Sequence, residues 1–296
     1  MSDTCAACGI GGRGLKICNG CNEVKYCGRE CQLKHRPVHK SACKKRAAER
    51  LDEKLFKDPP TRDECPICTL PLPIEGQHMS YQSCCGNTVC YGCTYAANVK
   101  MRTVLAQEGN LQISISPPCP FCRVPLPASI KKANERIQKR MDLGDAQAYC
   151  QRAGDYCIGI DGTPLDYGRA FELYTRSVEL GSADAHYELG NMYRSGKGRD
   201  VDVKKARHHY QMGAIGGNLM ARSNLGVLEA QQGKTERAMK HFMIAARNGF
   251  GKGMDGLQMG YSKGLVTKEE LDEATRAYEF AVNEMKSEQR SIAAVQ

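Results

Sequence analysis

Cysteine pairs at metal-ligand spacing dominate the first 122 residues of this chain, which hold all but two of its 17 cysteines. A histidine joins the pairs, which are Cys5 and Cys8, Cys18 and Cys21, Cys27 and Cys31, His39 and Cys43, Cys65 and Cys68, Cys84 and Cys85, Cys90 and Cys93, and Cys119 and Cys122. Structural zinc takes four ligands, so these sixteen side chains predict four closed sites. A closed site leaves no position for a substrate water. Zinc is therefore expected to build structure rather than to perform chemistry.

A disulfide scaffold is the alternative explanation for so many cysteines, and three features oppose it. The first residues contain no apolar segment typical of a secretory signal, the cysteine count is odd, and most pairs have the CxxC spacing that binds one ion. No apolar run approaches the length needed to cross a bilayer. We expect a soluble protein in a reducing compartment, with cytosol and nucleus both open because the cluster Lys44–Arg46 is too short to decide.

The formal charge of +9 is a weak argument for nucleic-acid binding. Thiols that bind zinc are deprotonated, so three all-cysteine sites and one mixed site would bring the total to about +2. Nucleic acid is therefore not an expected partner.

The first metal module covers residues 5–43, which read C-x2-C-x9-C-x2-C-x5-C-x3-C-x7-H-x3-C. This spacing, with Tyr26 directly before Cys27, resembles a MYND-type zinc finger. The family interleaves its ligands, which implies two zinc ions, the first held by Cys5, Cys8, Cys27 and Cys31 and the second by Cys18, Cys21, His39 and Cys43. His35 is an alternative ligand one helical turn before His39, although the family spacing favours His39. The resemblance also implies a protein-interaction module that docks proline-containing peptides.

The second metal module begins CPIC, contains SCCGNTVCYGC and ends CPFCRVP. It resembles a RING-type zinc finger, which implies two further ions, one held by Cys65, Cys68, Cys90 and Cys93 and the other by Cys84, Cys85, Cys119 and Cys122. The usual central histidine is missing. If Cys85 were the third ligand, Asn87 would take the histidine position, where an amide is a poor ligand. Cys84 and Cys85 can instead both bind in an all-cysteine variant, and His78 is an alternative fourth ligand.

The RING resemblance implies docking of a ubiquitin-conjugating enzyme. Ile67 matches the apolar contact of the family, Pro125 lies on the second zinc loop, and Arg123 takes the place of the basic linchpin, a role that suits a guanidinium. Tyr95 or Val99, in a helix-compatible run over residues 94–108, could supply another apolar contact. The reactive cysteine belongs to the conjugating enzyme, so no catalytic residue is expected in this chain.

The cysteine pattern stops after Pro127, and the carboxy-terminal half contains a repeat. An alanine, an aromatic residue four positions later and a small or β-branched residue four further on recur at Ala170, Ala206, Ala238 and Ala274, at intervals of 36, 32 and 36. Gly181, Gly217 and Gly249 follow the first three at one offset, as helix C-caps do. Such a period predicts a stacked helical solenoid. The pattern Leu189-Gly190-x2-Tyr193 resembles Sel-1-like repeats, which bind peptides or proteins on a curved face.

Other side chains of the carboxy-terminal half have ordinary expected roles. His208, His209 and His241 are expected to be groove or surface residues, and Cys150 and Cys157 to be buried and inert. Ser129 is expected to cap a helix in which Ile130, Ile137 and Met141 share one face.

The fold class that follows is multidomain, with two zinc-stapled cross-brace modules before an all-α solenoid. The expected segments are residues 1–45 for the MYND-type finger, 46–62 and 128–145 for linker helices, 63–127 for the RING-type finger, 146–288 for the repeats and 289–296 for a tail. The expected function is a RING-type ubiquitin ligase whose other modules recruit substrate. A non-enzymatic adaptor is the alternative, and a nuclear regulator that touches nucleic acid is disfavoured.

Overall fold

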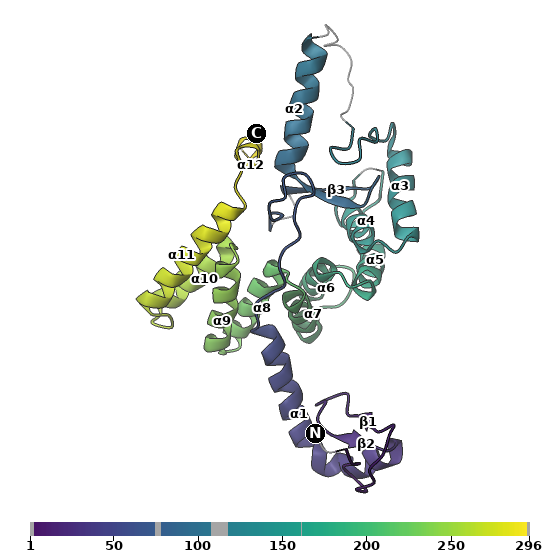
Figure 1. Cartoon of the computed structure of the whole chain (residues 1–296), viewed down its shortest axis with the longest axis vertical. Helices are drawn as coiled ribbons and strands as arrows, with labels where there is room; N and C mark the ends of the chain where they lie inside the picture. Colours follow the sequence, from purple (N-terminus) through teal and green to yellow (C-terminus); the bar gives the residue numbers. More distant parts are fainter. Residues whose placement is uncertain (1–2, 75–77, 108–117, 161, 295–296) are drawn as a thin grey trace. The chain divides into compact units, whose positions relative to one another are not determined.

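The computed structural model describes residues 3–74, 78–107, 118–160 and 162–294 (Figure 1). The chain divides into two compact units, Met1–Lys57 and Asp58–Gln296.

The first unit contains a short antiparallel hairpin and one long helix. Strands β1 (Lys16–Ile17) and β2 (Lys25–Tyr26) pair, and α1 covers Arg29–Leu55. The buried side chains of its small core are Cys5, Cys18, Cys21 and Tyr26. A core made mostly of cysteines is too small to hold a fold by itself, so this unit needs metal.

The second unit begins with the second cysteine-rich module. Its hairpin joins β3 (Met79–Gln82) and β4 (Asn87–Cys90) in antiparallel register, with Met79 opposite Cys90 and Gln82 opposite Asn87. Helix α2 (Tyr91–Gln107) follows β4 directly. The core consists of Cys65, Leu72, Val89 and Cys90, with Met79 packed against it.

The rest of the second unit is helical. Its helices are α3 (Ile130–Asp142), α4 (Ala146–Ile158), α5 (Tyr167–Glu179), α6 (Ala183–Ser195), α7 (Val203–Ile215), α8 (Leu219–Gln231), α9 (Thr235–Arg247), α10 (Gly251–Ser262), α11 (Lys268–Glu284) and α12 (Glu288–Ala293). Helices α4 to α11 pack against one another in sequence order as antiparallel pairs, which confirms the predicted solenoid (Figure 1).

Small residues on one helix of a repeat allow close approach of the aromatic residue on the next. A Cβ atom added to Gly190 of α6 would lie 2.5 Å from the ring of Tyr210 on α7, and one on Gly226 of α8 would lie 2.9 Å from Phe242 on α9. The repeated alanines are fully buried, as Ala206 shows. The predicted glycine C-caps are confirmed. Gly181, Gly217 and Gly249 have the left-handed backbone typical of helix ends, with φ values of +93°, +97° and +83°.

The second cysteine-rich module packs against several helices of the solenoid. Tyr81 of β3 donates a hydrogen bond of 2.7 Å from its hydroxyl to Asp145, the N-cap residue of α4. Ile74 packs against the cluster of Leu219 and Phe250. A groove of about 860 Å³ remains between Arg62–Ile74 and the first turns of α4, α6 and α8.

Two expectations for the connecting segments need correction. Residues 46–55 continue α1 without a break, and the helix ends at Leu55, so no separate helix covers 46–62. Helix α12 (Glu288–Ala293) begins at the last residue assigned to the repeats, covers most of the predicted tail 289–296, and packs against α2. Ser129 caps α3 as expected, by accepting a hydrogen bond from the Lys132 backbone. None of the helices in the described ranges combines the length and the apolar character needed to cross a bilayer.

Candidate metal centres

The structure brings the cysteine pairs together in four groups. Within each group the ligand atoms lie within 4.8 Å of one another. The groups are Cys5, Cys8, Cys27 and Cys31; Cys18, Cys21, His39 and Cys43; Cys65, Cys68, Cys90 and Cys93; and Cys84, Cys85, Cys119 and Cys122. They are called groups one to four below. Groups one and two interleave along the chain, and so do groups three and four, which is the cross-brace arrangement.

Separations between the ligand atoms fit zinc. Four sulfurs at about 2.3 Å from a tetrahedral ion would lie roughly 3.8 Å apart. The Sγ atoms of Cys8 and Cys27 are 3.7 Å apart, those of Cys68 and Cys90 are 3.8 Å apart, and the Sγ of Cys21 lies 3.4 Å from Nε2 of His39. All 17 cysteines are unbridged. The donor set is the cysteine and histidine chemistry that structural zinc prefers.

One backbone turn recurs in all four groups and aims two thiols at a common point. In each group, one CxxC pair begins the turn. The residue four positions after the first cysteine of that pair donates its N–H to that cysteine's carbonyl, over 2.8 to 3.0 Å, and has a left-handed backbone. These residues are Gly9, Asn22, Thr69 and Arg123, with φ values of +75°, +59°, +57° and +64°. A side chain in this conformation costs about 1 kcal/mol or more relative to glycine, so the turns store strain at three of the four positions.

The remaining ligands come from the helices and from the second hairpin. Cys31, His39 and Cys43 lie on α1, where a spacing of four places His39 and Cys43 on one face. Cys84 and Cys85 lie in the turn between β3 and β4. This turn is closed by a hydrogen bond from the N–H of Cys85 to the carbonyl of Gln82.

The alternative ligands considered from the sequence are not in the groups. His35 is hydrogen-bonded through Nδ1 to the Tyr26 hydroxyl at 3.0 Å, and its ring stacks on that of His39. Asn87 pairs with Gln82 in the hairpin, and Cys84 with Cys85 completes group four without His78.

Local hydrogen bonds favour the thiolate of one cysteine in every group. At Cys5 and Cys122, backbone N–H donors lower the pKa to about 6 and about 7. At Cys18 and Cys65, burial acts to raise the pKa, but backbone N–H donors together outweigh it and lower it to about 6 and about 7. Each group therefore offers one thiol that is readily deprotonated.

Several other thiols of the groups have a raised pKa. The hydrogen bond with Cys27 raises the pKa of Cys31 to about 12, and burial raises that of Cys43 to about 11. Burial also raises the pKa of Cys84 and Cys93. Because neighbouring thiols cannot all ionise without a cation, metal binding must displace protons.

Three residues predicted to contact a partner lie on the outer side of the zinc turns. Ile67 is 41% exposed, and both Arg123 and Pro125 are exposed. The Pro125 carbonyl accepts a hydrogen bond of 2.8 Å from Arg136 of α3. On α2, Val99 is exposed and Tyr95 is half-buried; residue 108, the end of the predicted helical run, lies outside the described residues.

Sequence reasoning missed Arg290 of α12, whose Nη2 lies 3.4 Å from Sγ of Cys68. No local pattern marked it, because it is separated from Cys68 by 222 positions. The expectation for His241 was wrong, since it is fully buried on the face of α9 that carries Ala238 and Phe242. Cys150 and Cys157 pack against the first repeat core, and burial raises the pKa of both.

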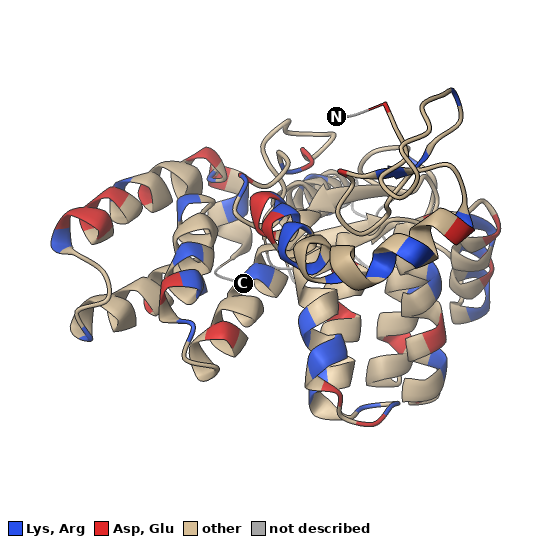
Figure 2. Cartoon of the chain, turned by 90° about the horizontal axis from the view of Figure 1, so that it is seen from below, with Lys and Arg blue, Asp and Glu red and all other residues tan. Residues whose placement is uncertain are grey.

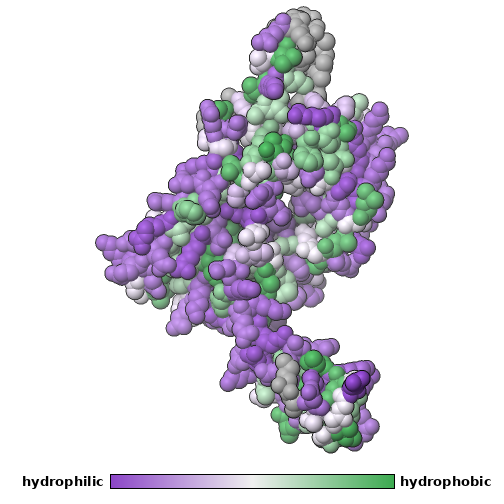
Figure 3. Space-filling model, viewed as in Figure 1, coloured by the Kyte–Doolittle hydropathy of each residue, from purple (hydrophilic) through white to green (hydrophobic). Residues whose placement is uncertain are grey.

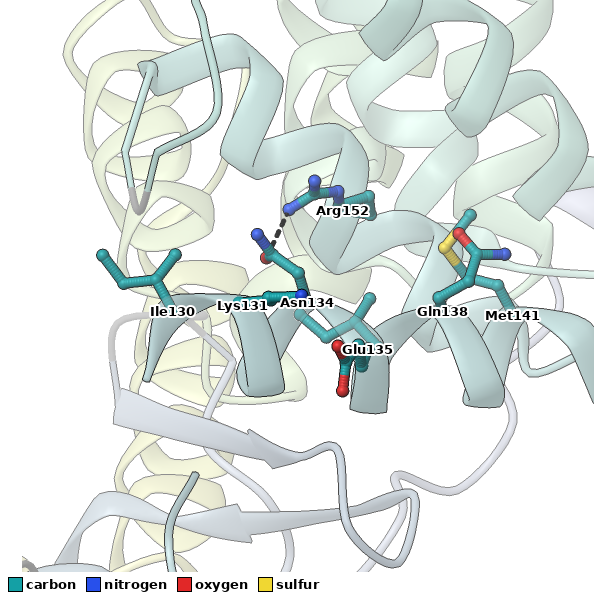
Figure 4. A pocket seen from close by; sticks show the side chains of 8 residues that line it. Ile130, Lys131, Asn134, Glu135, Gln138, Met141 and Arg152 are labelled. Carbon is teal, nitrogen blue, oxygen red and sulfur yellow. Dashed lines mark hydrogen bonds between the residues drawn. The ribbon is translucent and has the colours of Figure 1, made fainter. Parts of the chain in front are cut away.

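Two other surface features of the described residues give little support to a second candidate site. A cavity of about 490 Å³ lies beside α3, where Arg152 donates to the Asn134 side chain (Figure 4). Its lining mixes Ile130 and Met141 with Lys131 and Glu135, so it favours no class of ligand. Acidic and basic residues alternate along the helices of the second unit (Figure 2), which gives no support to a binding stripe for nucleic acid.

Comparison with known families identifies two of the modules. Residues 5–43 match the MYND finger, and residues 146–182 and 183–218 match the Sel1 repeat. The chain therefore contains a MYND finger and Sel1 repeats, which confirms the first prediction and confirms the second over residues 146–218. MYND fingers and Sel1 repeats are generally protein-interaction modules, and the MYND match together with the cysteine groups indicates zinc binding.

Curated relatives match only short parts of the chain. A segment of 67 residues, 23% of the chain, is 39% identical to an uncharacterized protein of Neisseria meningitidis serogroup B and spans 14% of it. A segment of 96 residues, 31% of the chain, is 31% identical to the exopolysaccharide production negative regulator of Rhizobium meliloti and spans 36% of it.

Two solved structures resemble the chain in part. A Sel1 repeat protein from Oxalobacter formigenes is 27% identical, with a TM-score of 0.46, and the match covers 61% of this chain and 69% of that one. A protective antigen of uropathogenic Escherichia coli with an SLR fold is 28% identical, with a TM-score of 0.44, and the match covers 51% of this chain and 33% of that one.

Proposed function

We propose that the chain binds four zinc ions and acts as a RING-type ubiquitin ligase, in which residues 63–127 dock a ubiquitin-conjugating enzyme. The MYND finger and the repeats would select the protein to be modified. The observation that carries this proposal is the second cross-brace, in which group three and group four interleave along the chain.

Exposed apolar side chains around the second cross-brace support docking of a protein there. Ile67 is exposed on the first zinc turn, and Tyr91, Val99 and Val104 are 43%, 42% and 43% exposed on α2. Figure 3 shows apolar colours over the region of α2, in contrast to the more hydrophilic surface of the repeat helices. Exposed apolar residues that gather on one element are typical of interaction sites.

Arg123 would supply a fixed cation beside this surface. Its guanidinium is exposed and always charged, and it has several donors for the carbonyl groups of ubiquitin and its carrier. The chain would contribute only the position of the thioester, whose reactive cysteine belongs to the partner. The left-handed backbone at Arg123 gives a clean test, because glycine suits that conformation and removes the side chain without added strain.

The test is reconstituted ubiquitin transfer with zinc-loaded full-length protein, activating enzyme, a panel of conjugating enzymes and ATP. Chains should form with at least one conjugating enzyme and should be lost in the Ile67→Ala and Arg123→Gly variants. Val38→Ala, which removes an exposed apolar side chain from α1, is the matched control and should be fully active. Fully metallated protein that forms no chains with any conjugating enzyme would refute the ligase.

A non-enzymatic adaptor is the second candidate. It is favoured by the family matches, which cover the MYND finger and the Sel1 repeats but not the second cysteine-rich module. An adaptor would bind its partners with the same affinity whether or not Arg123 is present. A ligase that lacks Arg123 would keep its substrates as well, so the ubiquitin-transfer assay, and not pull-down, separates the two candidates.

A further inference from the structure

The carboxy-terminal helix α12 lies against the third metal group, far from it in the sequence. Arg290 of α12 donates through Nη1 to the carbonyls of Pro71 and Met285, both at 2.8 Å. Its Nη2 lies 3.4 Å from the carbonyl of Leu70 and 3.4 Å from Sγ of Cys68. One guanidinium thus joins α12 to the zinc turn that begins at Cys65.

A glycine at the start of α2 makes this approach possible. A Cβ atom on Gly92 would lie 2.8 Å from both the backbone nitrogen and Cγ of Arg290, and 2.9 Å from its Cα. Gly92 lies between the ligands Cys90 and Cys93. The backbone of α12 therefore rests directly on the turn that carries half of group three.

A second arginine, Arg62, contacts both this turn and the segment before α12. Nη1 of Arg62 lies 3.3 Å from the Leu72 carbonyl and 2.7 Å from Sδ of Met285. The segment from Met285 to Arg290 is thus fixed to residues 70–72 by contacts from both arginines. The described contacts make this segment a clasp between the end of the solenoid and the turn.

The positive charge of Arg290 complements the negative charge of a zinc–thiolate site. Zinc held by four thiolates carries a charge of −2, and Cys65 and Cys90 of group three are fully buried. Arg290 places a permanent positive charge and a hydrogen-bond donor next to Cys68. Partners of this kind orient a ligand and slow metal loss, and their removal commonly changes metal affinity by 10- to 100-fold.

We propose that α12 is a clasp for the zinc ion of group three and that Arg290 is its positioning residue. The clasp makes retention of this one ion depend on the carboxy-terminal end of the solenoid. The proposal rests on zinc in group three but not on ligase activity, so ubiquitin transfer is not its readout.

The test measures zinc release from the full-length, zinc-loaded protein with a chromogenic chelator. Arg290→Ala removes the cation, whereas Gly92→Ala displaces α12 and leaves every ligand in place. Both variants should release one of the four ions about 10-fold faster and leave the other three unchanged. Lys286→Ala is the control, because this exposed lysine contacts only Asn283 among the hydrogen bonds described and should behave as wild type.

Cadmium NMR identifies the ion that is affected. In cadmium-loaded protein, the resonance that shifts in both variants should be the one that disappears in a Cys68→Ser variant. Unchanged release of all ions in both variants would overturn the proposal. Equally faster release of all four ions, or a shift of a cadmium resonance other than that of group three, would overturn it too. The contact would then act on the stability of the whole protein.

Discussion

Replacement of Asp145 by alanine should destabilise the second unit by roughly 3 kcal/mol, because one carboxylate accepts hydrogen bonds from four residues. Its Oδ1 accepts hydrogen bonds from the backbone N–H groups of Gln147 and Ala148 at the start of α4. Its Oδ2 accepts from the Tyr81 hydroxyl at 2.7 Å and from Arg140 at 2.7 and 2.9 Å. The side chain is only 13% exposed, so water cannot easily replace these partners.

The expected loss can be divided among the partners. The helix cap contributes about 1 kcal/mol. The hydrogen bond from Tyr81 to a charged group contributes about 1.5 kcal/mol. The Arg140 pair adds about 0.5 kcal/mol because it is partly screened by solvent. Together these terms give the total of roughly 3 kcal/mol, of which only the cap is internal to the solenoid.

Urea unfolding of the zinc-loaded protein, followed by far-ultraviolet circular dichroism, measures the loss. Asp202→Ala is the matched control, because the Asp202 side chain caps α7 through the Lys205 backbone N–H. Among the described residues, the only other partner of this side chain is the Lys205 ammonium at 3.8 Å. It should cost about 1 kcal/mol. Tyr81→Phe alone should cost about 1.5 kcal/mol, which is about three quarters of the difference between the two aspartate variants. Equal losses for Asp145→Ala and Asp202→Ala would refute the reasoning, since the contacts with Tyr81 and Arg140 would then contribute nothing.

The comparison belongs at neutral pH for a reason that the structure supplies. Burial acts to raise the pKa of Asp145, but hydrogen bonds from Tyr81 and Arg140 outweigh it and hold the pKa below its ordinary value. A carboxylate with a lowered folded-state pKa stabilises the protein above its unfolded pKa, which is about 3.9, and this contribution disappears as the pH falls through the folded-state pKa. At neutral pH the contribution is complete.

Three further predictions follow from the metal groups and the repeats. Chelation should unfold residues 5–122 and leave α4 to α11 helical, which circular dichroism and limited proteolysis would measure. One cooperative loss of all helix signal would contradict the separate cores. Zinc affinity should fall by more than about tenfold for each unit by which the pH is lowered, because thiols with raised pKa values, such as Cys31 and Cys43, must lose protons to bind. Competition with a chelator of known affinity measures the zinc affinity at each pH. An affinity that does not change with pH would contradict this prediction. Gly190→Ala should lower the free energy of unfolding in urea by about 1–3 kcal/mol, since the new Cβ would lie 2.5 Å from the buried ring of Tyr210. The control is Gly154→Ala, whose new Cβ would have its nearest neighbour at 3.8 Å, and which should be neutral or stabilising.

The sequence predicted the features that depend on short stretches of chain. Spacing and family resemblance predicted the same four groups that the structure brings together, because a tetrahedral site requires paired ligands a few residues apart. The zinc ions themselves stay a prediction. The repeat was predictable for a similar reason, since the alanine, aromatic and glycine positions recur with the period of a helix pair, and the described helices follow that period.

Features that depend on distant contacts were not predictable from one sequence. His241 is buried because it shares a helix face with Ala238 and Phe242, but a histidine in an amphipathic helix gives no sign of the face it occupies. Helix α12 is too short and too polar to show a clear period, so residues 289–296 were interpreted as a tail.

The contacts of Tyr81 and Arg290 together change what metal loss should do to the solenoid. Tyr81 binds the N-cap residue of the first repeat helix, and Arg290, just after the last repeat helix, binds the turn that begins at Cys65. The second cysteine-rich module therefore contacts both ends of the solenoid. If zinc left group three, both contacts would be lost, and the Asp145 network alone would remove about 1.5 kcal/mol from the first repeat. The solenoid should then remain folded after chelation but unfold at a lower urea concentration. A solenoid independent of the module would show the same urea midpoint with and without zinc.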